Sequence, residues 1–202
     1  MHKKNVGDGP PGSWSKSNHL ESLAWLFENF TKISWLNPGP LLYGNLNIER
    51  TASHLGLDTD TVQEWLDDPK FAHYKNCVPE FKPIDKNETE TIEFLCNLIG
   101  LDTTKVSIFL QTLRPGGMAP WHLDGKKHIE YGVSPEQEHL CERHIIFLED
   151  QHPGQMWQIN DDYISWKKGD ILTWQQSSAP HGTANVGYHD RHIIMISGLK
   201  KI

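Results

Sequence analysis

The second half of the chain consists of short apolar and β-branched segments that follow one another closely. From about residue 104 onward these segments are separated by Gly, Pro and Asp, and no segment with helical periodicity lies between them. Many short strands at close spacing predict a β-sandwich or a closed barrel, whereas a parallel α/β sheet would need a helix after each strand. We predict eight strands, at residues 105–113, 118–123, 143–149, 155–159, 162–166, 170–174, 181–186 and 191–198.

The first hundred residues have a different texture. Residues 1–17 are rich in Gly, Pro, Ser and Lys, which is typical of a loose N-terminal arm. The spacing of apolar residues then predicts a helix over 18–36, with Asn18 and Glu21 as a capping box at its start. Two shorter helices are predicted at 59–67 and at 88–99, the second with Asn87 as its cap and Gly100 at its end.

These two textures predict a single domain over residues 18–202. We expect a helical annex at about 18–103 and a β core at about 104–202. A long polar stretch at 125–142 interrupts the β core, and such a loop is typical of a lid or of a substrate-binding segment.

Charge and cysteine content narrow the functional class. The formal net charge is −7 at pH 7, which argues against a general nucleic-acid binder because such a protein needs a basic face. The start of the chain lacks the apolar core of a signal peptide, and no apolar run reaches membrane-spanning length. The cysteines form no CxxC pair, so we expect free thiols in a cytoplasmic protein; they are Cys77, Cys96 and Cys141.

One motif in the β core carries the residue types of a metal site. In "APWHLDGKK", one residue separates His122 from Asp124. Residues i and i+2 of a strand point to the same face, so an imidazole nitrogen and a carboxylate oxygen would lie side by side. His181, in "SSAPHGTANVG", is the best candidate for a third ligand. Two histidines and one carboxylate suit non-haem iron(II) with open coordination positions. The alternative is a hydrogen-bonded polar cluster at the rim of a barrel.

Arg191 opens the last predicted strand, ahead of "HIIMISG". An arginine that points into a barrel is costly unless it meets an anion, and its planar fork fits a carboxylate with two hydrogen bonds. A dicarboxylate that chelates iron at one end and meets Arg191 at the other would explain both features, and 2-oxoglutarate is such a molecule. The alternative is a surface ion pair with Asp190 or Glu142, which would contribute little energy.

The residues His122-x-Asp124, His181 and Arg191, in this order and at these spacings, resemble the motif of the iron(II)- and 2-oxoglutarate-dependent dioxygenases. The surroundings "HGTAN" and "KKGD" are similar as well, and the resemblance covers about residues 105–198. It implies a mainly β fold with flanking helices: a double-stranded β-helix of the jelly-roll, cupin-like kind. It also implies that the triad holds Fe(II), that Arg191 holds 2-oxoglutarate, and that O₂ is used to hydroxylate an unactivated C–H bond, with succinate and CO₂ as coproducts.

Within that superfamily the chain looks closest to the branch of aspartyl/asparaginyl β-hydroxylase-like and free-proline hydroxylases. In that branch a second arginine lies on a middle strand, where "RHIIFL" offers Arg143. The chain keeps Asp124, which aspartyl β-hydroxylases replace with glycine, and it has Arg191 where prolyl 4-hydroxylases carry lysine. Three roles stay open for Arg143: holding oxoglutarate, holding a substrate carboxylate, or pairing with Glu149 or Asp150.

Other residues near the motif have both a functional and a structural interpretation. Asn185 could orient the cosubstrate or cap a turn, and Trp121, which abuts the first ligand, is predicted to wall the substrate pocket. Alternation places His144 and His192 on the opposite face from the arginines that precede them. The other tryptophans of the β region are predicted to lie in the core; they are Trp157, Trp166 and Trp174.

Two rival interpretations remain open at the level of sequence. A cupin-like protein of the same barrel class could bind zinc, manganese or nickel without oxoglutarate, and it would not need Arg191 in its interior. A non-catalytic β-sandwich would need no metal. For the oxygenase interpretation we expect a small-molecule, amino-acid or peptide substrate, and no nucleic-acid or membrane partner.

Overall fold

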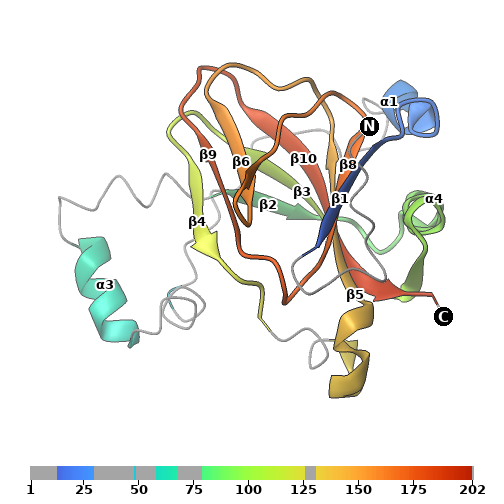
Figure 1. The fold of residues 1–202 in the computed structure, drawn as a ribbon, viewed down its shortest axis with the longest axis horizontal. Coiled ribbons are helices and arrows are strands. Elements are labelled where there is room, and N and C mark those ends of the chain that lie inside the picture. Colours follow the sequence, from blue (N-terminus) through green and yellow to red (C-terminus); the bar gives the residue numbers. More distant parts are fainter. Residues whose placement is uncertain (1–12, 30–47, 49–57, 68–78, 126–130, 202) are drawn as a thin grey trace.

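The computed structural model describes residues 13–29, 48, 58–67, 79–125 and 131–201 (Figure 1). No helix in these ranges is both long and apolar enough to cross a membrane. The described helices are α1 (Ala24–Asn29), α3 (Thr59–Asp67), α4 (Thr89–Ile99) and the 3₁₀-helix η2 (Pro135–Leu140). The described strands are β1 (Trp14–Asn18), β2 (Glu80–Pro83), β3 (Leu101–Leu113), β4 (Met118–His122), β5 (Cys141–Phe147), β6 (Gln155–Ile159), β7 (Asp162–Tyr163), β8 (Asp170–Gln175), β9 (His181–Asn185) and β10 (Arg191–Lys200).

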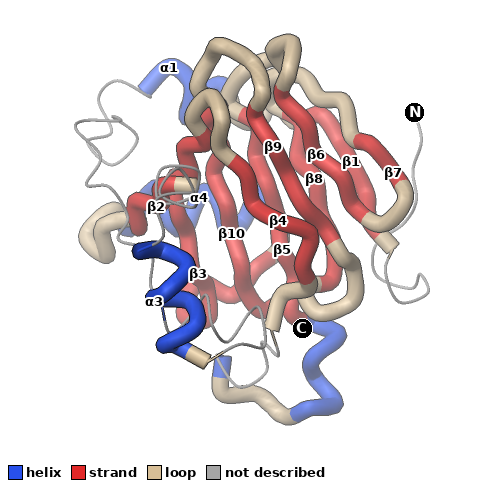
Figure 2. Tube along the Cα trace, turned by 90° about the vertical axis from the view of Figure 1, so that its left-hand side faces the viewer, coloured by secondary structure: helices blue, strands red, loops and turns tan. Residues whose placement is uncertain are grey.

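The strands form two antiparallel sheets that face one another (Figures 1 and 2). The larger sheet has the order β1-β8-β5-β10-β3-β2, and the smaller sheet has the order β4-β9-β6-β7. Neighbouring strands are often distant in the sequence, because the chain passes repeatedly from one sheet to the other. The protein is therefore mainly β, with a double-stranded β-helix core, as the sequence predicts.

The larger sheet is covered on both faces, which is why all seven residues of β5 are buried. One face lines the interior between the two sheets, where Ile145 and Phe147 pack with Trp157 and Trp174. The other face is covered by α1 and α4. Alternation along β5 thus sends Arg143, Ile145 and Phe147 inward and their neighbours toward the helices.

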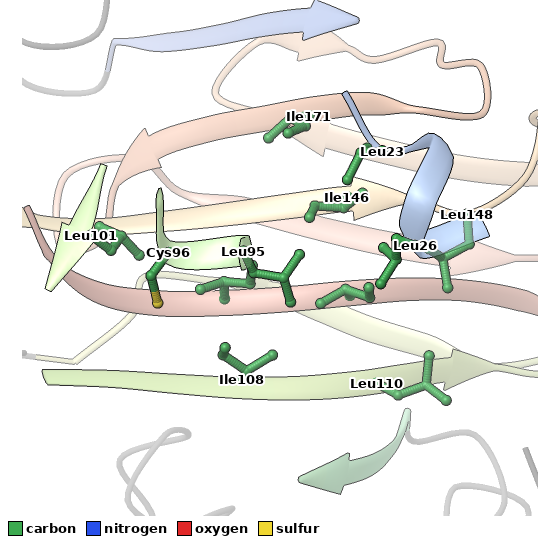
Figure 3. Packing of buried hydrophobic residues seen from close by; sticks show 12 residues of the cluster. Leu23, Leu26, Leu95, Cys96, Leu101, Ile108, Leu110, Ile146, Leu148 and Ile171 are labelled. Atoms are coloured by element: carbon green, nitrogen blue, oxygen red, sulfur yellow. The ribbon is translucent and has the colours of Figure 1, made fainter. Parts of the chain in front are cut away.

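The helix-covered face holds the second apolar cluster (Figure 3). Leu23, just before α1, Leu26 of α1 and Leu95 of α4 are fully buried against the sheet residues Ile146 and Ile171. Burying one such side chain stabilises the fold by about 1.5–3 kcal/mol. Helix α4 ends at Gly100, whose positive φ of 76° is the left-handed conformation that lets its N–H reach the carbonyl of Cys96.

Several predicted elements are confirmed. Helix α3 and strand β6 have the predicted bounds, and α4 starts one residue later than predicted. The remaining predicted strands are present with ends shifted by a few residues, except that the predicted strand 162–166 contracts to Asp162–Tyr163. Cys96 and Cys141 are free thiols, as predicted, and Cys77 lies outside the described residues.

The N-terminal predictions need correction. The predicted arm at residues 1–17 extends too far, because Trp14–Asn18 form strand β1 and pair with Asp170–Trp174. Asn18 is therefore not a helix cap: its Nδ2 donates to Asp170 Oδ1 at 2.8 Å. The predicted helix 18–36 begins only at Ala24, and its part beyond Asn29 lies outside the described residues.

The annex and the predicted lid also differ from expectation. The annex at 18–103 is not purely helical, because β2 adds an edge strand beside β3. Glu88, not Asn87, stands at the cap of α4, and it makes no side-chain capping bond. Within the predicted lid 125–142, η2 is a short helix with a Ser134–Gln137 capping box, and the last two residues belong to β5. Residues 126–130 lie outside the described part of the chain.

Candidate metal centre

The three predicted metal ligands lie together at one end of the smaller sheet. Strands β4 and β9 are neighbours, and their register pairs His122 with His181. The two imidazole rings are 4.4 Å apart between centroids, and Asp124 Oδ2 lies 4.0 Å from His181 Nε2. One potential ligand atom from each of the three residues lies within 4.8 Å of the others. Among the described residues this is the one such group of histidine, cysteine and carboxylate side chains.

Both imidazoles are oriented in the same way by the backbone. His122 Nδ1 donates to the carbonyl of Pro120 at 2.6 Å, and His181 Nδ1 donates to the carbonyl of Ala179 at 2.9 Å. Each bond fixes the proton on Nδ1, so that Nε2 carries the lone pair that a metal needs. Burial lowers the pKa of His181 to about 4, although the nearby Asp124 carboxylate acts to raise it. The low pKa keeps the ring neutral at pH 7.

Asp124 supplies an observation that favours a bound cation. Its Oδ2 is buried and makes no hydrogen bond with any of the residues that the structure describes. A buried carboxylate oxygen without a partner is rare, and here it stands next to two imidazoles with lone pairs on Nε2. Nitrogen and oxygen donors of this kind suit iron(II), and also zinc or manganese. The residues therefore fit a divalent transition metal.

The reason for the position of Asp124 differs from the predicted one. Strand β4 ends at His122, so Asp124 follows the strand and does not share its pleat. Its Oδ1 instead accepts a hydrogen bond at 2.8 Å from Nη2 of Arg143 on β5. This ion pair links the smaller sheet to the larger one. Of the three roles left open for Arg143, a pairing with Glu149 or Asp150 is replaced by this pairing with Asp124, and the two ligand-binding roles stay predictions.

A glycine lets the two ligand strands approach. Gly182 follows His181 and faces away from the interior, toward the backbone of β4. A Cβ at this position would lie 3.2 Å from the Trp121 amide nitrogen and 3.3 Å from the Ala119 carbonyl oxygen. The pairing of β4 with β9 is irregular between Ala119 and His122. Such a bulge re-aims side chains, and here it accompanies the orientation of His122 toward His181.

Arg191 is the second unusual feature of the interior. It is fully buried, and in the described part of the chain it makes no ion pair with a carboxylate. Its Nη1 donates to Thr183 Oγ1 and its Nη2 donates to Gln111 Oε1 at 3.2 Å, while Nε makes no hydrogen bond. The guanidinium carbon lies 4.9 Å from the centre of the Trp157 ring. Burial lowers the pKa of Arg191 to about 9, with the Glu149 carboxylate opposing the shift.

The alternative of a surface ion pair for Arg191 is excluded by this burial. A buried guanidinium with only neutral partners is an electrostatic cost that an anion in the interior would offset. Thr183 and Gln111 are the functional candidates that the sequence analysis missed. The signal for Thr183 was present, because it stands two residues after His181 and therefore shares its face on a strand.

The spacing between the triad and Arg191 follows from β9. His181 and Thr183 both point inward, and two residues of a strand span roughly 7 Å. The guanidinium of Arg191 donates a hydrogen bond to the second of them, Thr183. An elongated ligand that lies along the inner face of β9 would therefore meet the triad with one end and Arg191 with the other.

Other predicted site residues have different outcomes. Asn185 is fully buried and serves a turn: its Nδ2 donates to the carbonyls of Leu113 and His189, both at 2.8 Å, and its Oδ1 accepts from the Gly187 amide at 3.2 Å. Of the two predicted roles for Asn185, these contacts support the turn cap, and the role in binding the cosubstrate stays a prediction. Trp121 is 51% exposed beside His122, and its role as a substrate wall stays a prediction.

The remaining aromatic and histidine predictions are confirmed. Trp157, Trp166 and Trp174 are core residues, and the ring of Trp174 packs 4.8 Å from the ring of His181. The two histidines that follow arginines lie on the opposite face: His144 contacts Thr173 and His192 contacts Thr112.

Comparison with known proteins shows the fold and not a family. No family model and no curated protein matches the sequence. A prolyl-4-hydroxylase from Pseudomonas putida is similar in structure with a TM-score of 0.52, covering 94% of both chains at 10% identity. A cupin domain of an XRE family transcriptional regulator from Enterobacter cloacae has a TM-score of 0.40 (12% identity, 61% of this chain and 98% of that one). A predicted oxalate decarboxylase from Thermotoga maritima has a TM-score of 0.39 (15% identity, 60% of this chain and 80% of that one).

Proposed function

We propose that this protein is an oxygenase that uses Fe(II), 2-oxoglutarate and O₂ to hydroxylate an unactivated C–H bond, releasing succinate and CO₂. The observation that carries the proposal is the pairing of two features on one inner face. A His-Asp-His triad stands near one end of this face, and the buried guanidinium of Arg191, which makes no ion pair with a described carboxylate, reaches from β10 to Thr183, two residues after His181 on β9. A metal-binding protein without a dicarboxylate cosubstrate would not need the second feature.

In this proposal each group has a defined task. Nε2 of His122, Nε2 of His181 and Oδ2 of Asp124 would hold the ferrous ion. Arg191, with Thr183 beside it, would receive the far carboxylate of oxoglutarate, for which the guanidinium fork is well suited. When bound, iron and oxoglutarate together activate O₂ and supply the oxidising power for the hydroxylation.

The surrounding side chains support such chemistry by excluding water. Trp174 packs on the ring of His181, and Trp157 lies under the guanidinium of Arg191. Both indoles are almost fully buried, so they shield the groups beside them from water. A low-dielectric site strengthens the attraction between Arg191 and a carboxylate. The structural likeness to the prolyl-4-hydroxylase from Pseudomonas putida supports the fold needed for this arrangement.

The substrate class is a small molecule or an amino-acid or protein side chain, following the resemblance to the asparaginyl- and proline-hydroxylase branch. The rival function is that of a cupin-like metal protein without oxoglutarate chemistry. The oxygenase and the cupin-like metal protein can be distinguished because only the oxygenase would bind oxoglutarate at its metal and convert it to succinate.

The test is an anaerobic titration of the Fe(II)-loaded protein with 2-oxoglutarate, followed by succinate measurement in air against a panel of free amino acids, peptides and nucleosides. We expect a weak visible charge-transfer band on oxoglutarate addition, and succinate release stimulated by a panel member. His181→Ala should abolish both, and His189→Ala, an exposed histidine remote from the triad, should abolish neither. A protein that binds iron but shows no band and no succinate favours the rival.

A further inference from the structure

Arg143 donates a hydrogen bond to one of the two carboxylate oxygens of Asp124, and this contact determines which oxygen is left for a metal. Nη2 of Arg143 donates to Oδ1 at 2.8 Å, and both side chains are more than nine-tenths buried. The other oxygen, Oδ2, has no hydrogen-bond partner and faces His181 Nε2. One carboxylate oxygen of Asp124 therefore bonds to the arginine, and the other faces the candidate metal position.

Among the described residues, Arg143 is the hydrogen-bond partner that holds Asp124 in place. It lies two residues after the end of β4, outside the hydrogen-bond ladder of the smaller sheet. Arg143, by contrast, lies within β5, which is paired on one side with β8 and on the other with β10. The ion pair therefore ties a loop carboxylate to the middle of the larger sheet.

The guanidinium is itself anchored from behind. With its amide oxygen turned toward Arg143, the fully buried Gln176 accepts from Nε at 3.2 Å and from Nη2 at 3.1 Å. The same oxygen accepts from Ser197 Oγ at 3.1 Å. Nη1 contacts the sulfur of Met195. A relay of Ser197, Gln176, Arg143 and Asp124 thus runs from β10 to the metal position.

We propose that Arg143 is a positioning residue that makes Asp124 a single-oxygen ligand through Oδ2. Because Arg143 holds Oδ1 in a hydrogen bond, the carboxylate binds the metal through Oδ2 alone. Bidentate binding through both oxygens would use one more coordination position. A centre that must accept a chelating cosubstrate and O₂ needs those positions open. Partners that orient ligands in this way generally change metal affinity when they are removed. The inference rests on the proposed function for its purpose, and on the metal-binding part alone for its test.

The test uses Co²⁺ as the probe, added to the metal-free full-length protein, and follows affinity and the visible absorption bands. Arg143→Lys keeps the positive charge but loses the planar fork, so it separates positioning from electrostatics. We expect Co²⁺ to bind about 10–100-fold more weakly, with bands shifted from those of the unaltered protein. Arg114→Gln is the matched control, since it removes another arginine–carboxylate pair, with Glu80 at 2.7 Å, at the opposite end of the barrel; it should change neither.

An Arg143→Lys protein that is folded by circular dichroism and binds Co²⁺ with unchanged affinity and bands overturns the proposal. That result would leave the ion pair with a purely structural role, visible only as a lower melting temperature. If Arg143→Lys does not fold, Gln176→Leu takes its place, because it removes the anchor of the guanidinium and should weaken Co²⁺ binding severalfold; unchanged binding there overturns the proposal equally. Because neither readout involves oxoglutarate, absence of succinate formation would contradict the oxygenase function alone.

Discussion

Arg191 donates a hydrogen bond to Thr183, and Thr183 shares the inner face of β9 with His181, two residues away. Strand geometry separates His181 from Thr183 by roughly 7 Å. The other groups reach this face from elsewhere: Arg191 from β10, His122 from β4 and Asp124 from the segment after β4. The inner face of β9 thus links one of the proposed metal ligands to the partner of the buried guanidinium.

The first prediction concerns Thr183. Thr183→Val preserves shape but removes the hydroxyl that positions the guanidinium of Arg191. We expect 2-oxoglutarate to bind about 10-fold more weakly, the loss of roughly one hydrogen bond to a charged group, with Co²⁺ affinity unchanged. Isothermal titration calorimetry measures oxoglutarate binding to the metal-loaded protein and, in a separate titration, Co²⁺ binding to the metal-free protein.

Thr173→Val is the matched control for this experiment. Thr173 lies on β8 and contacts His144 on the helix-covered face of the larger sheet, so its hydroxyl does not face the interior. Equal oxoglutarate affinity in Thr183→Val and in the unaltered protein would show that Arg191 needs no partner on β9.

The second prediction is a pH dependence of stability in the metal-free protein. The pKa of His181 falls from 6.5 to about 4 on folding, mainly because the ring is buried. Between these two values the unfolded chain binds a proton that the folded protein does not, so the free energy of unfolding decreases as the pH falls. The contribution reaches about 3 kcal/mol near pH 4.

Urea unfolding at pH 7, 6, 5 and 4 measures this dependence. His181→Asn lacks the titrating ring, so its stability should fall less steeply over the same range, with the two curves diverging below pH 6.5. Parallel curves for the two proteins would mean that His181 is protonated as easily in the folded protein as in the unfolded chain.

The third prediction concerns the glycine between the ligand strands. Gly182→Ala places a Cβ 3.2–3.3 Å from backbone atoms of Ala119 and Trp121, which cannot move aside as a flexible side chain would. Strand β4 must shift by a few tenths of an ångström, carrying His122 away from His181. We expect a destabilisation of about 1–3 kcal/mol from overpacking and weaker Co²⁺ binding.

A larger residue at position 182 should have a larger effect in the same direction. Ala184→Val, which adds volume to the same face of β9 two residues farther on, tests whether bulk on this face matters in general. If Gly182→Ala and Ala184→Val weaken Co²⁺ binding equally, the close approach of β4 is not what sets the geometry of the histidines.

The sequence predicted those parts of the fold that depend on local pattern. The apolar and β-branched runs of β3, β5, β8 and β10 are visible without any tertiary information, and so is the glycine that ends α4. Strand β1 was missed because "WSKSN" is polar, and its pairing depends on residues far along the chain. Trp14 Nε1 donates to Asp162 and Asn18 Nδ2 donates to Asp170, contacts that no local signal reveals.

In the candidate site, too, the residues that local sequence reveals differ from those that depend on tertiary contacts. His122, His181 and Arg191 could be found because residue type, order and strand alternation all pointed to one interior. Asp124 was identified correctly for a partly wrong reason, because an ion pair with Arg143 and not the strand pleat brings it to the histidines. Gln111 could not be found, since a lone glutamine in the middle of β3 carries no signal until β3 and β10 are known to be neighbours.

The last prediction separates a structural asparagine from a cosubstrate ligand. Asn185 uses its amide to hold the carbonyls of Leu113 and His189 and the amide of Gly187. In Asn185→Ala two buried carbonyls lose their donor, and we expect the free energy of unfolding to fall by about 2–4 kcal/mol. The Michaelis constant for 2-oxoglutarate, measured below the lowered melting temperature, should stay within a factor of two of the unaltered protein. A rise of 10-fold or more at unchanged stability would return Asn185 to the cosubstrate site, because a residue whose role is only to brace a turn should lower stability when it is replaced.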